Sequence, residues 1–540
     1  MEIKKEKPAR GSTSSPDHIM ISINGDAATS MAVTWRTSTD VGAGYVEYHE
    51  DGGEIYRADA EQGVFESDID TSHMFWCTLK GLKPDTKYYY TCGSDAHRSE
   101  TFSFTTAPEH LTKFKFACVA DQQKGEPHHC PDYSRFNSFL KQVLEEHPDT
   151  RFILTGGDNT DCGQHEVQWN GLFASGYAGV VESVPLMMAL GNHDDRGFAD
   201  YEKGTGKYYS DPAEFFSNQF RGSYADNGPE GWKTASYAFD YGNVHFNILG
   251  LSGQEFVRDW VIEDLKGCKQ TWKLGTYHFP ICYSGTDCQN YEAYPLMREA
   301  FELFDLVFSG HEHNFSRSFP LKNEELFDRP SQGTIHYMLG NSHYNPPGSR
   351  TLQKVWHAAF HPQEEQVCCV CIVEVDGDKM TLTSVFNDGR IIDQCTIDKS
   401  TDTILPYVQP PIYNRTRMKF KGMDLGLCQV DTPCVEKDGV WYAPLAVLIG
   451  CVGGLVEKKP GRVSLEIYGK SAVFTEGSDT AQTNQGEVKL SASVFRGARE
   501  QLYIPCDACA VFGMRWNYAP RNNFISFEVE TQAHPVTEQP

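Results

Sequence analysis

The feature that most constrains this chain is the stretch 154–161, where two glycines separate an apolar run from an aspartate. The run 151–154 predicts a short buried strand, because most of its residues are apolar. Gly156 and Gly157 permit a sharp turn at the strand end and leave the side chain of Asp158 at the edge of the sheet. An aspartate after two glycines also suits a turn or a helix N-cap, so this stretch alone does not establish a site.

Four further polar clusters follow apolar runs in the same manner and come in order along the chain. They are Asp121, Gly191-Asn192-His193-Asp194, His278 and Gly310-His311-Glu312-His313, which follow the runs 114–120, 185–190, 272–277 and 306–309. Carboxylate, amide oxygen and imidazole are ligands for Mn, Fe or Zn rather than for a thiolate-bound structural zinc. Core histidines scattered at random would not fall repeatedly at strand ends, so the pattern predicts a metal centre.

The composition describes a globular chain with a large acidic excess. It has 540 residues, of which 40% are hydrophobic and 12% aromatic, so it can bury sizeable cores and is expected to form about three domains. The net charge of -25 argues against a broad surface for nucleic acid or anionic membranes. It does not exclude a phosphate substrate, because bound metals would supply positive charge locally. No apolar run is long enough to span a bilayer.

The first residues and the cysteines bear on the compartment. The segment 1–7 is charged and lacks an apolar core, so it is not a signal peptide. We therefore expect a cytoplasmic protein, or a secreted or cell-envelope one if a leader has been removed. The 17 cysteines are an odd number, so at least one is unpaired within the chain. Cys368-Cys369-Val370-Cys371 lies in a strand-like segment and suggests reduced thiols in a core, which favours a reducing compartment.

Two domains are expected in the first three quarters of the chain. After a polar, disordered lead-in over 1–15, residues 16–108 show short alternating runs separated by turn residues, which predicts a β-sandwich. In residues 111–398, strands alternate with helical stretches, as in 136–146 and 256–265. This alternation indicates βαβ units and an α/β domain.

A third domain is expected over 418–531, after a proline-bearing linker over 399–417 and before a tail over 532–540. It contains an internal repeat, because the stretch 441–450 is echoed by 502–513. Each copy reads as a strand, a proline at a helix start, a short helix and a final glycine. The repeat predicts a small α+β domain.

The five polar clusters together resemble the motifs of the metallophosphoesterase superfamily, and within it those of the purple acid phosphatases. That family carries an Asp motif, then Gly-Asp, Gly-Asn-His-Asp/Glu, a lone His and Gly-His-x-His, in the order found here. The resemblance implies a four-layer α/β/β/α sandwich over 111–398 with the site at the carboxyl ends of the strands. It extends to 16–108, which resembles the family's fibronectin-III-like N-terminal domain, notably at Trp35 and Gly81-Leu82-Lys83-Pro84-Asp85-Thr86.

The resemblance also implies a role for each polar residue. Asp158 would bridge two divalent or trivalent ions, with Fe, Mn and Zn all compatible with the ligand set. Asp121 and His313 would complete the first metal site, and Asn192, His278 and His311 the second. His193 would stand beside the substrate as an acid or a hydrogen-bond donor to phosphate. We expect its neighbour Asp194 to be a catalytic residue as well.

Two positions depart from the family pattern. Purple acid phosphatases carry a tyrosine three residues after the bridging aspartate, where this chain has Asp161, so no purple charge-transfer colour is expected. Many other members carry a histidine two residues after the first aspartate, where this chain has Gln123. Asp161, Gln123 or water would have to supply the missing ligand. His128 lies in a loop after the first aspartate, where it is either solvated or in contact with substrate, and Tyr283 is a candidate for the pocket wall.

The third domain resembles the small domain named for the N-terminus of copper amine oxidases, which recurs as an accessory module in bacterial proteins. Cys506 and Cys509 form a CxxC pair at helix positions that Leu445 and Leu448 fill in the first copy of the repeat. Core packing is therefore favoured over redox chemistry or zinc binding, and no second CxxC lies within this domain to complete a zinc site. The expected role is that of a spacer or of a module that binds a protein or a glycan.

Two functions remain open at this point. The first is a dinuclear metal-dependent phosphoesterase that hydrolyses phosphate monoesters or diesters through a metal-activated hydroxide. The second is a binding or assembly protein that retains the fold around an impaired, mono- or non-metallated site, which the departures at Gln123 and Asp161 favour. The loops 162–179, 199–231 and 314–332, which are expected to form the rim of the pocket, carry no motif that indicates a substrate.

Overall fold

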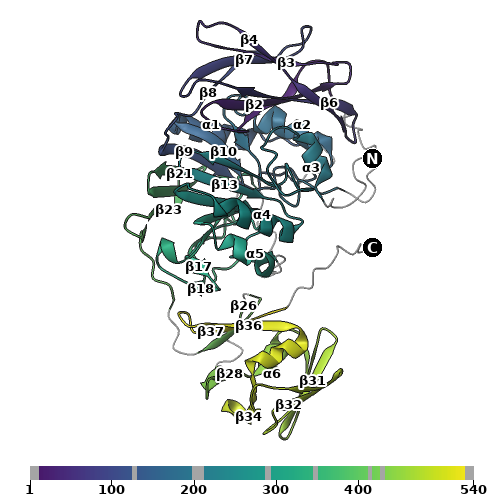
Figure 1. Cartoon of the computed structure of the whole chain (residues 1–540), viewed down its shortest axis with the longest axis vertical. Helices are drawn as coiled ribbons and strands as arrows, with labels where there is room; N and C mark the ends of the chain where they lie inside the picture. The colour runs from purple at the N-terminus through teal and green to yellow at the C-terminus, as the bar shows by residue number, and fades with distance from the viewer. Residues whose placement is uncertain are drawn as a thin grey trace. The chain divides into compact units, whose positions relative to one another are not determined.

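The computed structural model describes residues 11–124, 130–197, 212–285, 293–344, 351–365, 367–411, 416–421, 423–425 and 432–529 (Figure 1). The chain divides into two compact units. The first holds residues 1–290, 297–320 and 328–409, and the second holds 291–296, 321–327 and 410–540. Within the described ranges, every helix is too short or too polar to cross a membrane.

Residues 17–105 form the predicted β-sandwich. One sheet has the order β1 (Asp17–Ser22), β2 (Ser30–Ser38), β6 (Thr71–Lys80), β5 (Glu61–Glu66), and the other β4 (Tyr56–Asp59), β3 (Tyr45–Glu50), β7 (Lys87–Gly93), β8 (Phe102–Thr105). Trp35 is fully buried between the sheets and stacks on Phe75 at 5.2 Å between ring centroids. The alternation of apolar residues in this region therefore predicted its architecture correctly.

The central domain is mixed α/β, as predicted, and contains two seven-stranded sheets. The first has the order β11 (Leu186–Met187), β10 (Thr150–Thr155), β9 (Lys113–Val119), β21 (Cys369–Asp376), β22 (Lys379–Phe386), β23 (Ile391–Asp398), β24 (Thr403–Leu405). The second has the order β12 (Tyr237–Tyr241), β13 (Val244–Leu249), β14 (Trp272–Tyr277), β15 (Leu306–Ser309), β19 (Ile335–Leu339), β16 (Phe315–Ser318), β20 (His357–His361). Strand β24 lies inside the segment 399–417, which was expected to be a linker. It pairs with β23 and so extends the first sheet.

Aromatic residues from the two sheets pack against one another in a single core. Phe116 of β9 meets Phe246 of β13 with ring centroids 5.4 Å apart, and Phe152 of β10 meets Phe239 of β12 at 5.8 Å. The longer helices follow parallel strands, as in βαβ units. They are α1 (Ser134–Glu146), α4 (Gln254–Lys266) and α5 (Ala293–Phe301), with shorter pieces at α2 (Glu166–Gly171), η1 (Leu172–Gly176), α3 (Glu214–Gln219) and η2 (Pro330–Gln332).

The second unit is β-rich rather than evenly α+β. Its sheets are β26 (Met423–Asp424), β25 (Arg417–Phe420), β37 (Phe524–Val529), β36 (Met514–Ala519); β27 (Val435–Lys437), β28 (Val440–Ala443), β35 (Leu502–Pro505), β34 (Phe495–Arg496); and β29 (Leu455–Lys459), β30 (Arg462–Ile467), β31 (Lys470–Thr475), β32 (Thr480–Thr483), β33 (Gly486–Lys489). The hairpin β17 (Leu321–Lys322) and β18 (Glu325–Leu326) belongs to this unit as well.

The internal repeat of the second unit gives two different helices. The first copy forms the α-helix α6 (Leu445–Cys451), whereas the second forms the 3₁₀ helix η4 (Cys506–Phe512), and a further 3₁₀ turn is η3 (Ala498–Glu500). Cys506 and Cys509 are buried in the same apolar core. A short helix therefore forms in the second copy where it was predicted, with 3₁₀ rather than α-helical hydrogen bonds.

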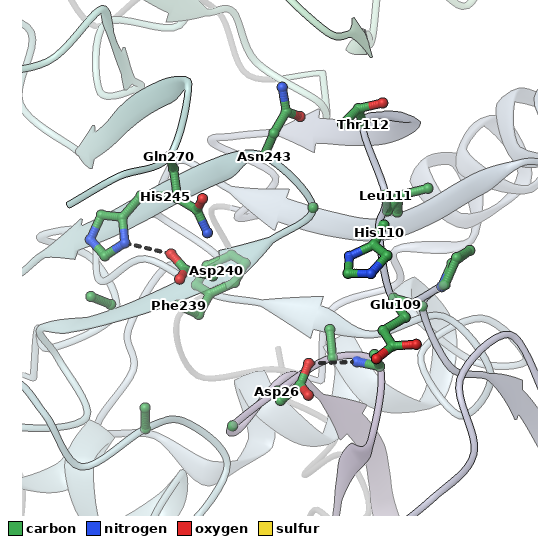
Figure 2. Close-up of a pocket in the computed structure, with 18 of the residues that line it drawn as sticks. Asp26, Glu109, His110, Leu111, Thr112, Phe239, Asp240, Asn243, His245 and Gln270 are labelled. Carbon is green, nitrogen blue, oxygen red and sulfur yellow. Dashed lines mark hydrogen bonds and ion pairs between the residues drawn. The ribbon is translucent and has the colours of Figure 1, made fainter.

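A cavity of about 670 Å³ lies between the sandwich and the hairpin of β12 and β13 (Figure 2). His245, in its wall, bonds Asp240 through Nδ1 at 2.6 Å and Asp264 through Nε2 at 2.7 Å. Both ring nitrogens can donate only in the imidazolium form. Burial lowers the pKa of His245, but the two carboxylates outweigh it and raise the pKa to about 10.

This ion triad predicts a pH-dependent contribution to stability. Because the pKa of His245 is about 10 in the folded protein and about 6.5 in the unfolded chain, its contribution is complete below pH 6.5 and is lost as the pH rises through 10. His245→Gln should cost about 2 kcal/mol at pH 6, the worth of hydrogen bonds to charged groups. Thermal denaturation at pH 6, 8 and 10 should show the gap between variant and wild type shrinking, and a constant gap would contradict this account.

Candidate metal centre

The five polar clusters meet at the carboxyl ends of parallel strands from both central sheets. Asp121 follows β9, Asp158 follows β10, His278 follows β14, and His311 and His313 follow β15. Strands β9 and β10 are parallel neighbours, as are β14 and β15, so each pair delivers its polar residues to one edge. The packing of the two sheets then brings the two edges together.

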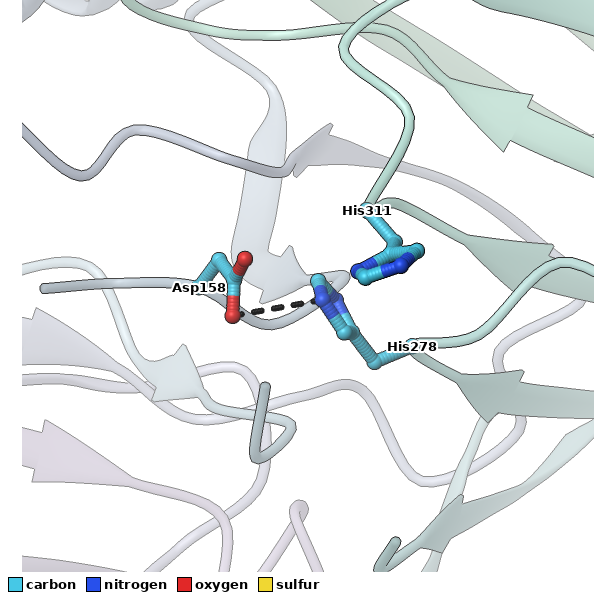
Figure 3. Close-up of side chains that lie close together, drawn as sticks. All are labelled: Asp158, His278 and His311. Carbon is cyan, nitrogen blue, oxygen red and sulfur yellow. Dashed lines mark ion pairs between the residues drawn. The ribbon is translucent and has the colours of Figure 1, made fainter. Parts of the chain in front are cut away.

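One group consists of Asp158, His278 and His311, whose side chains converge in Figure 3. Nε2 of His278 lies 3.2 Å from Oδ1 of Asp158. The amide oxygen of Asn192 joins them, at 3.1 Å from Nε2 of His278 and 2.9 Å from Nδ1 of His311. The four residues that the resemblance assigns to the bridge and the second metal therefore lie together.

A second group consists of Asp121, Asp158 and His313. Nε2 of His313 lies 3.9 Å from Oδ1 of Asp121. The side-chain amide of Gln123 lies in the same place, with Nε2 at 3.1 Å from Nε2 of His313 and 3.3 Å from Oδ2 of Asp158. A half-turn of this amide would present its oxygen there, so Gln123 can offer a metal the ligand that the family's histidine would provide.

The two groups fit a pair of metal ions. Within each group the ligand atoms all lie within 4.8 Å of one another, and Asp158 is common to both. The donors are oxygen and nitrogen, which suits Fe, Mn and Zn. Nδ1 of His278 lies 2.8 Å from the carbonyl oxygen of Gly156, so it carries the proton and leaves Nε2 for a metal.

The backbone is strained at four of these residues. Asp121, Asp158, His311 and His313 have φ values of 52°, 55°, 80° and 55°, in the left-handed region that residues with a side chain rarely adopt. The packing also excludes side chains nearby, because a Cβ on Gly191 would lie 2.0 Å from the backbone nitrogen of Asp158. Such strain collects at functional sites, where the surrounding structure fixes the ligands in advance.

Burial and the neighbouring charges shift the pKa values of four residues of the centre. Burial raises the pKa of Asp121 to about 6. Burial also acts to raise the pKa of Asp158, but the nearby imidazoles, His278 foremost, hold it well below its usual range. Burial lowers the pKa of His278, whereas Asp158 outweighs it and raises the pKa to about 9. Burial and the charge of His278 lower the pKa of His311 to about 3.

His193 stands beside the metal ligands and is oriented by Asp161. Its Nδ1 lies 2.9 Å from the carbonyl oxygen and 3.1 Å from Oδ1 of Asp161, and its Nε2 lies 3.9 Å from Oδ2 of Asp158. Arg196 donates to the same Oδ1 of Asp161 at 2.9 Å. Asp161 therefore holds His193 in place, at the position where the family has its tyrosine. Burial lowers the pKa of His193, but Asp158 and Asp161 outweigh it and raise the pKa.

Asp194 does not occupy the catalytic position expected for it. Its carboxylate is fully buried and accepts hydrogen bonds from the backbone N–H groups of Gly191 at 2.8 Å and Thr160 at 2.9 Å. It also accepts one from Nδ2 of Asn159 at 2.8 Å. This carboxylate ties the two ligand-bearing loops together and has no surface left for substrate.

Two candidates remain, His128 and Tyr283, and neither is in a contact that assigns it to the centre within the described residues. His128 falls outside them. Tyr283 packs its ring against Trp356 at 5.2 Å. Glu312, between the two histidines of its motif, turns away and accepts hydrogen bonds from the backbone of Ser284 at 2.7 Å and Gly285 at 3.1 Å. Sequence reasoning missed Arg196, whose place two residues after a metal-site motif was the available signal.

Two family models match consecutive parts of the chain. Residues 16–106 match the purple acid phosphatase N-terminal domain, and residues 114–315 match the calcineurin-like phosphoesterase domain. Neither match reaches residues 410–540, which make up most of the second unit.

The chain is similar to plant phosphatases at low identity. It is 26% identical to "Purple acid phosphatase 15" of Arabidopsis thaliana over 323 residues, which are 52% of this chain and 54% of the relative. It is 23% identical to "Probable inactive purple acid phosphatase 27" of the same plant, over 60% of each chain. The chain thus spans just over half the length of the curated relatives it matches. The structure of purple acid phosphatase PPD1 from yellow lupin seeds superposes with a TM-score of 0.55 at 18% identity, over 71% of this chain and 74% of that one, which supports the fold.

The geometry of the centre predicts that metal ions bind the folded chain and stabilise it. A ligand at one hundred times its Kd adds about 2.7 kcal/mol to the free energy of unfolding. Adding Mn, Zn or Fe to chelator-treated protein should therefore raise Tm. The same additions should leave Tm of Asp158→Asn unchanged, because both groups lose their shared carboxylate. Equal shifts in variant and wild type would place the binding elsewhere.

Proposed function

We propose that this chain, which carries a purple acid phosphatase N-terminal domain and a calcineurin-like phosphoesterase domain, hydrolyses phosphate monoesters or diesters at a dinuclear metal centre. The observation that carries the proposal is the position of Asp158, whose carboxylate is shared by two acid–histidine groups. Asp121, His313 and Gln123 would complete the first metal site. The second would use Asn192, His278 and His311.

The chemistry of phosphate esters explains why such a centre is useful. Anionic esters repel hydroxide, and a pair of bound Fe, Mn or Zn ions would polarise the phosphoryl oxygens and supply hydroxide near neutral pH. The chain would hold the ligands for both ions before they bind, since Asp121, Asp158 and His278 are buried and the backbone at Asp121, Asp158, His311 and His313 is left-handed. Preorganised charge of this kind makes the largest contribution to the rate enhancement of many enzymes.

His193 is the proposed proton donor beside the centre. Asp161 holds Nδ1, so the second ring nitrogen, Nε2, points toward the shared carboxylate of Asp158. There it can donate to a phosphoryl oxygen or protonate the leaving oxygen. The raised pKa of His193 keeps it protonated toward higher pH, as a donor requires. A positioned general acid contributes on the order of 10²–10⁴ in rate.

A binding protein with an impaired site is the second candidate. Gln123 supports it, because a neutral amide is a weaker ligand than the imidazole that many family members have at this position. Some similar plant proteins carry names that call them inactive, such as "Probable inactive purple acid phosphatase 24". In either case the C-terminal unit is proposed to be a copper amine oxidase N-terminal-like accessory module for a protein or a glycan.

Turnover decides between these two functions. Metal-loaded wild type should hydrolyse a chromogenic phosphomonoester or phosphodiester, and Asp158→Asn should have no activity. Asp259→Asn, which removes an exposed carboxylate of α4, is the matched control and should keep full activity. Absence of turnover in wild type with Mn, Fe and Zn would favour the binding protein.

The role of His193 has a separate signature. His193→Ala should keep its metals and lower kcat by about 10²–10⁴. Asp161→Ala should also keep its metals, with a smaller fall of about tenfold, because His193 remains but loses its orientation. Elemental analysis alongside kinetics checks both variants. Loss of a metal in either would make that residue a ligand and contradict the role assigned to it here.

A further inference from the structure

The β-sandwich contacts the central domain at the segment that follows Asp158 in the chain. Arg36 of β2 carries a buried guanidinium that donates to Asp17 through Nε at 2.8 Å and Nη2 at 2.7 Å. Its third nitrogen donates to Glu166, the first residue of α2. The side chains of Arg36 and Glu166 are only 2% and 1% exposed. A sandwich cation is therefore buried against the start of a central-domain helix.

A second sandwich residue holds the backbone at the same point. Oδ1 of Asp68 accepts the N–H of Glu166 at 2.9 Å, and Oδ2 lies 3.7 Å from Nδ1 of His165. Free N–H groups at a helix start need such an acceptor, and a carboxylate is also favoured there by the helix dipole. Arg36 and Asp68 together fix both the side chain and the backbone where α2 begins.

The start of α2 is tied in turn to the catalytic loops. The N–H of Gly163 donates to the carbonyl oxygen of His193 at 2.9 Å, and the N–H of Gln164 donates to that of Arg196 at 3.2 Å. From within α2, Oε1 of Gln168 accepts the N–H of Asp161 at 3.3 Å. These contacts join α2 to the loop of Asp161 and to the loop of His193.

The segment before α2 packs closely against the loop that carries His193 and Asp194. A Cβ on Gly163 would lie 1.6 Å from the carbonyl oxygen of Asp194, so the two loops touch at backbone level. Movement of α2 by a fraction of an ångström would therefore move Asp161 relative to His193. Misplacement of catalytic groups by about 1 Å can cost on the order of a hundredfold in rate.

Glu166 depends on its sandwich partner. Burial raises the pKa of Glu166 to about 7, even though Arg36 acts in the opposite direction. A carboxylate buried this deeply would not remain charged and in place without the guanidinium. The buried position of Glu166 therefore requires Arg36 of the sandwich. Without the sandwich, the start of α2 would have to rearrange.

We propose that Arg36 and Asp68 are positioning residues, through which the sandwich domain fixes the start of α2 and so aligns Asp161 with His193. The proposal rests on the function proposed above. It gives the N-terminal domain a part in turnover, although it contributes no ligand and touches no substrate.

The test compares sandwich variants that differ in what they contact. Arg36→Met and Asp68→Ala remove the two supports of α2, and Asp68→Asn retains an oxygen that can accept the N–H of Glu166. Tyr90→Phe is the matched control, because its buried hydroxyl donates to the carbonyl oxygen of Glu182 at 2.8 Å across the same junction but away from the catalytic loops. Each is measured in the full chain for kcat, KM, metal content and Tm.

We expect Arg36→Met and Asp68→Ala to lower kcat about tenfold, with KM within about threefold and metal content unchanged. Asp68→Asn and Tyr90→Phe should retain the kcat of wild type. An unchanged kcat in Asp68→Ala would overturn the positioning role, as would an equal loss in Tyr90→Phe at equal Tm. Asp68→Ala keeps the test valid if Arg36→Met does not fold. Wild type without turnover overturns the proposed function, which the first assay reveals before any variant is compared.

Discussion

The carboxylate of Asp158 is the group on which the rest of the site depends. It is buried, its backbone is left-handed, and it belongs to two acid–histidine groups at once. A lone carboxylate in such a place would take up a proton, because burial disfavours its charge. The surrounding imidazoles and the N–H of His193, which donates to Oδ1 at 2.9 Å, keep it anionic. The fold thus maintains a negative charge where two cations are to be held.

The residues around this carboxylate form successive layers. Asp194 and Glu312, although they stand within metal-site motifs, face away and anchor the ligand-bearing loops. Asp161 and Arg196 orient His193. Behind them, α2 rests on Arg36 and Asp68 of the sandwich. In the proposed enzyme, each layer would fix the one in front of it and give the site the precision that catalysis requires.

The sequence predicted the architecture and the convergence of the candidate ligands because both follow from local patterns. Apolar runs that end in polar residues place those residues at strand ends, and parallel strands bring their carboxyl ends to one edge. This reasoning brought Asp121, Asp158, His278 and His311 together correctly. It failed for Asp194 and did not reveal that Asp161 contacts His193, since the orientation of a side chain within a loop depends on partners that the local pattern does not show. Asp194, for example, is fixed by Thr160, 34 residues earlier in the chain.

Longer-range features were out of reach for the same reason. Arg36 and Glu166 are 130 residues apart, and neither lies in a recognisable motif. In the C-terminal unit, the second copy of the repeat forms a 3₁₀ helix although its sequence resembles the α-helical first copy. Tertiary packing decides between such close alternatives, and propensity alone does not.

The ratio of metal to protein in freshly purified wild type tests the central claim most directly. Elemental analysis should find two ions of Fe, Mn or Zn for each chain, because Asp158 is shared by two ligand groups and Gln123 can complete the weaker one. A ratio of one or less after these metals are added back and the excess removed would contradict a dinuclear centre. The group of Asp121 and His313 would then be a remnant that this chain does not use.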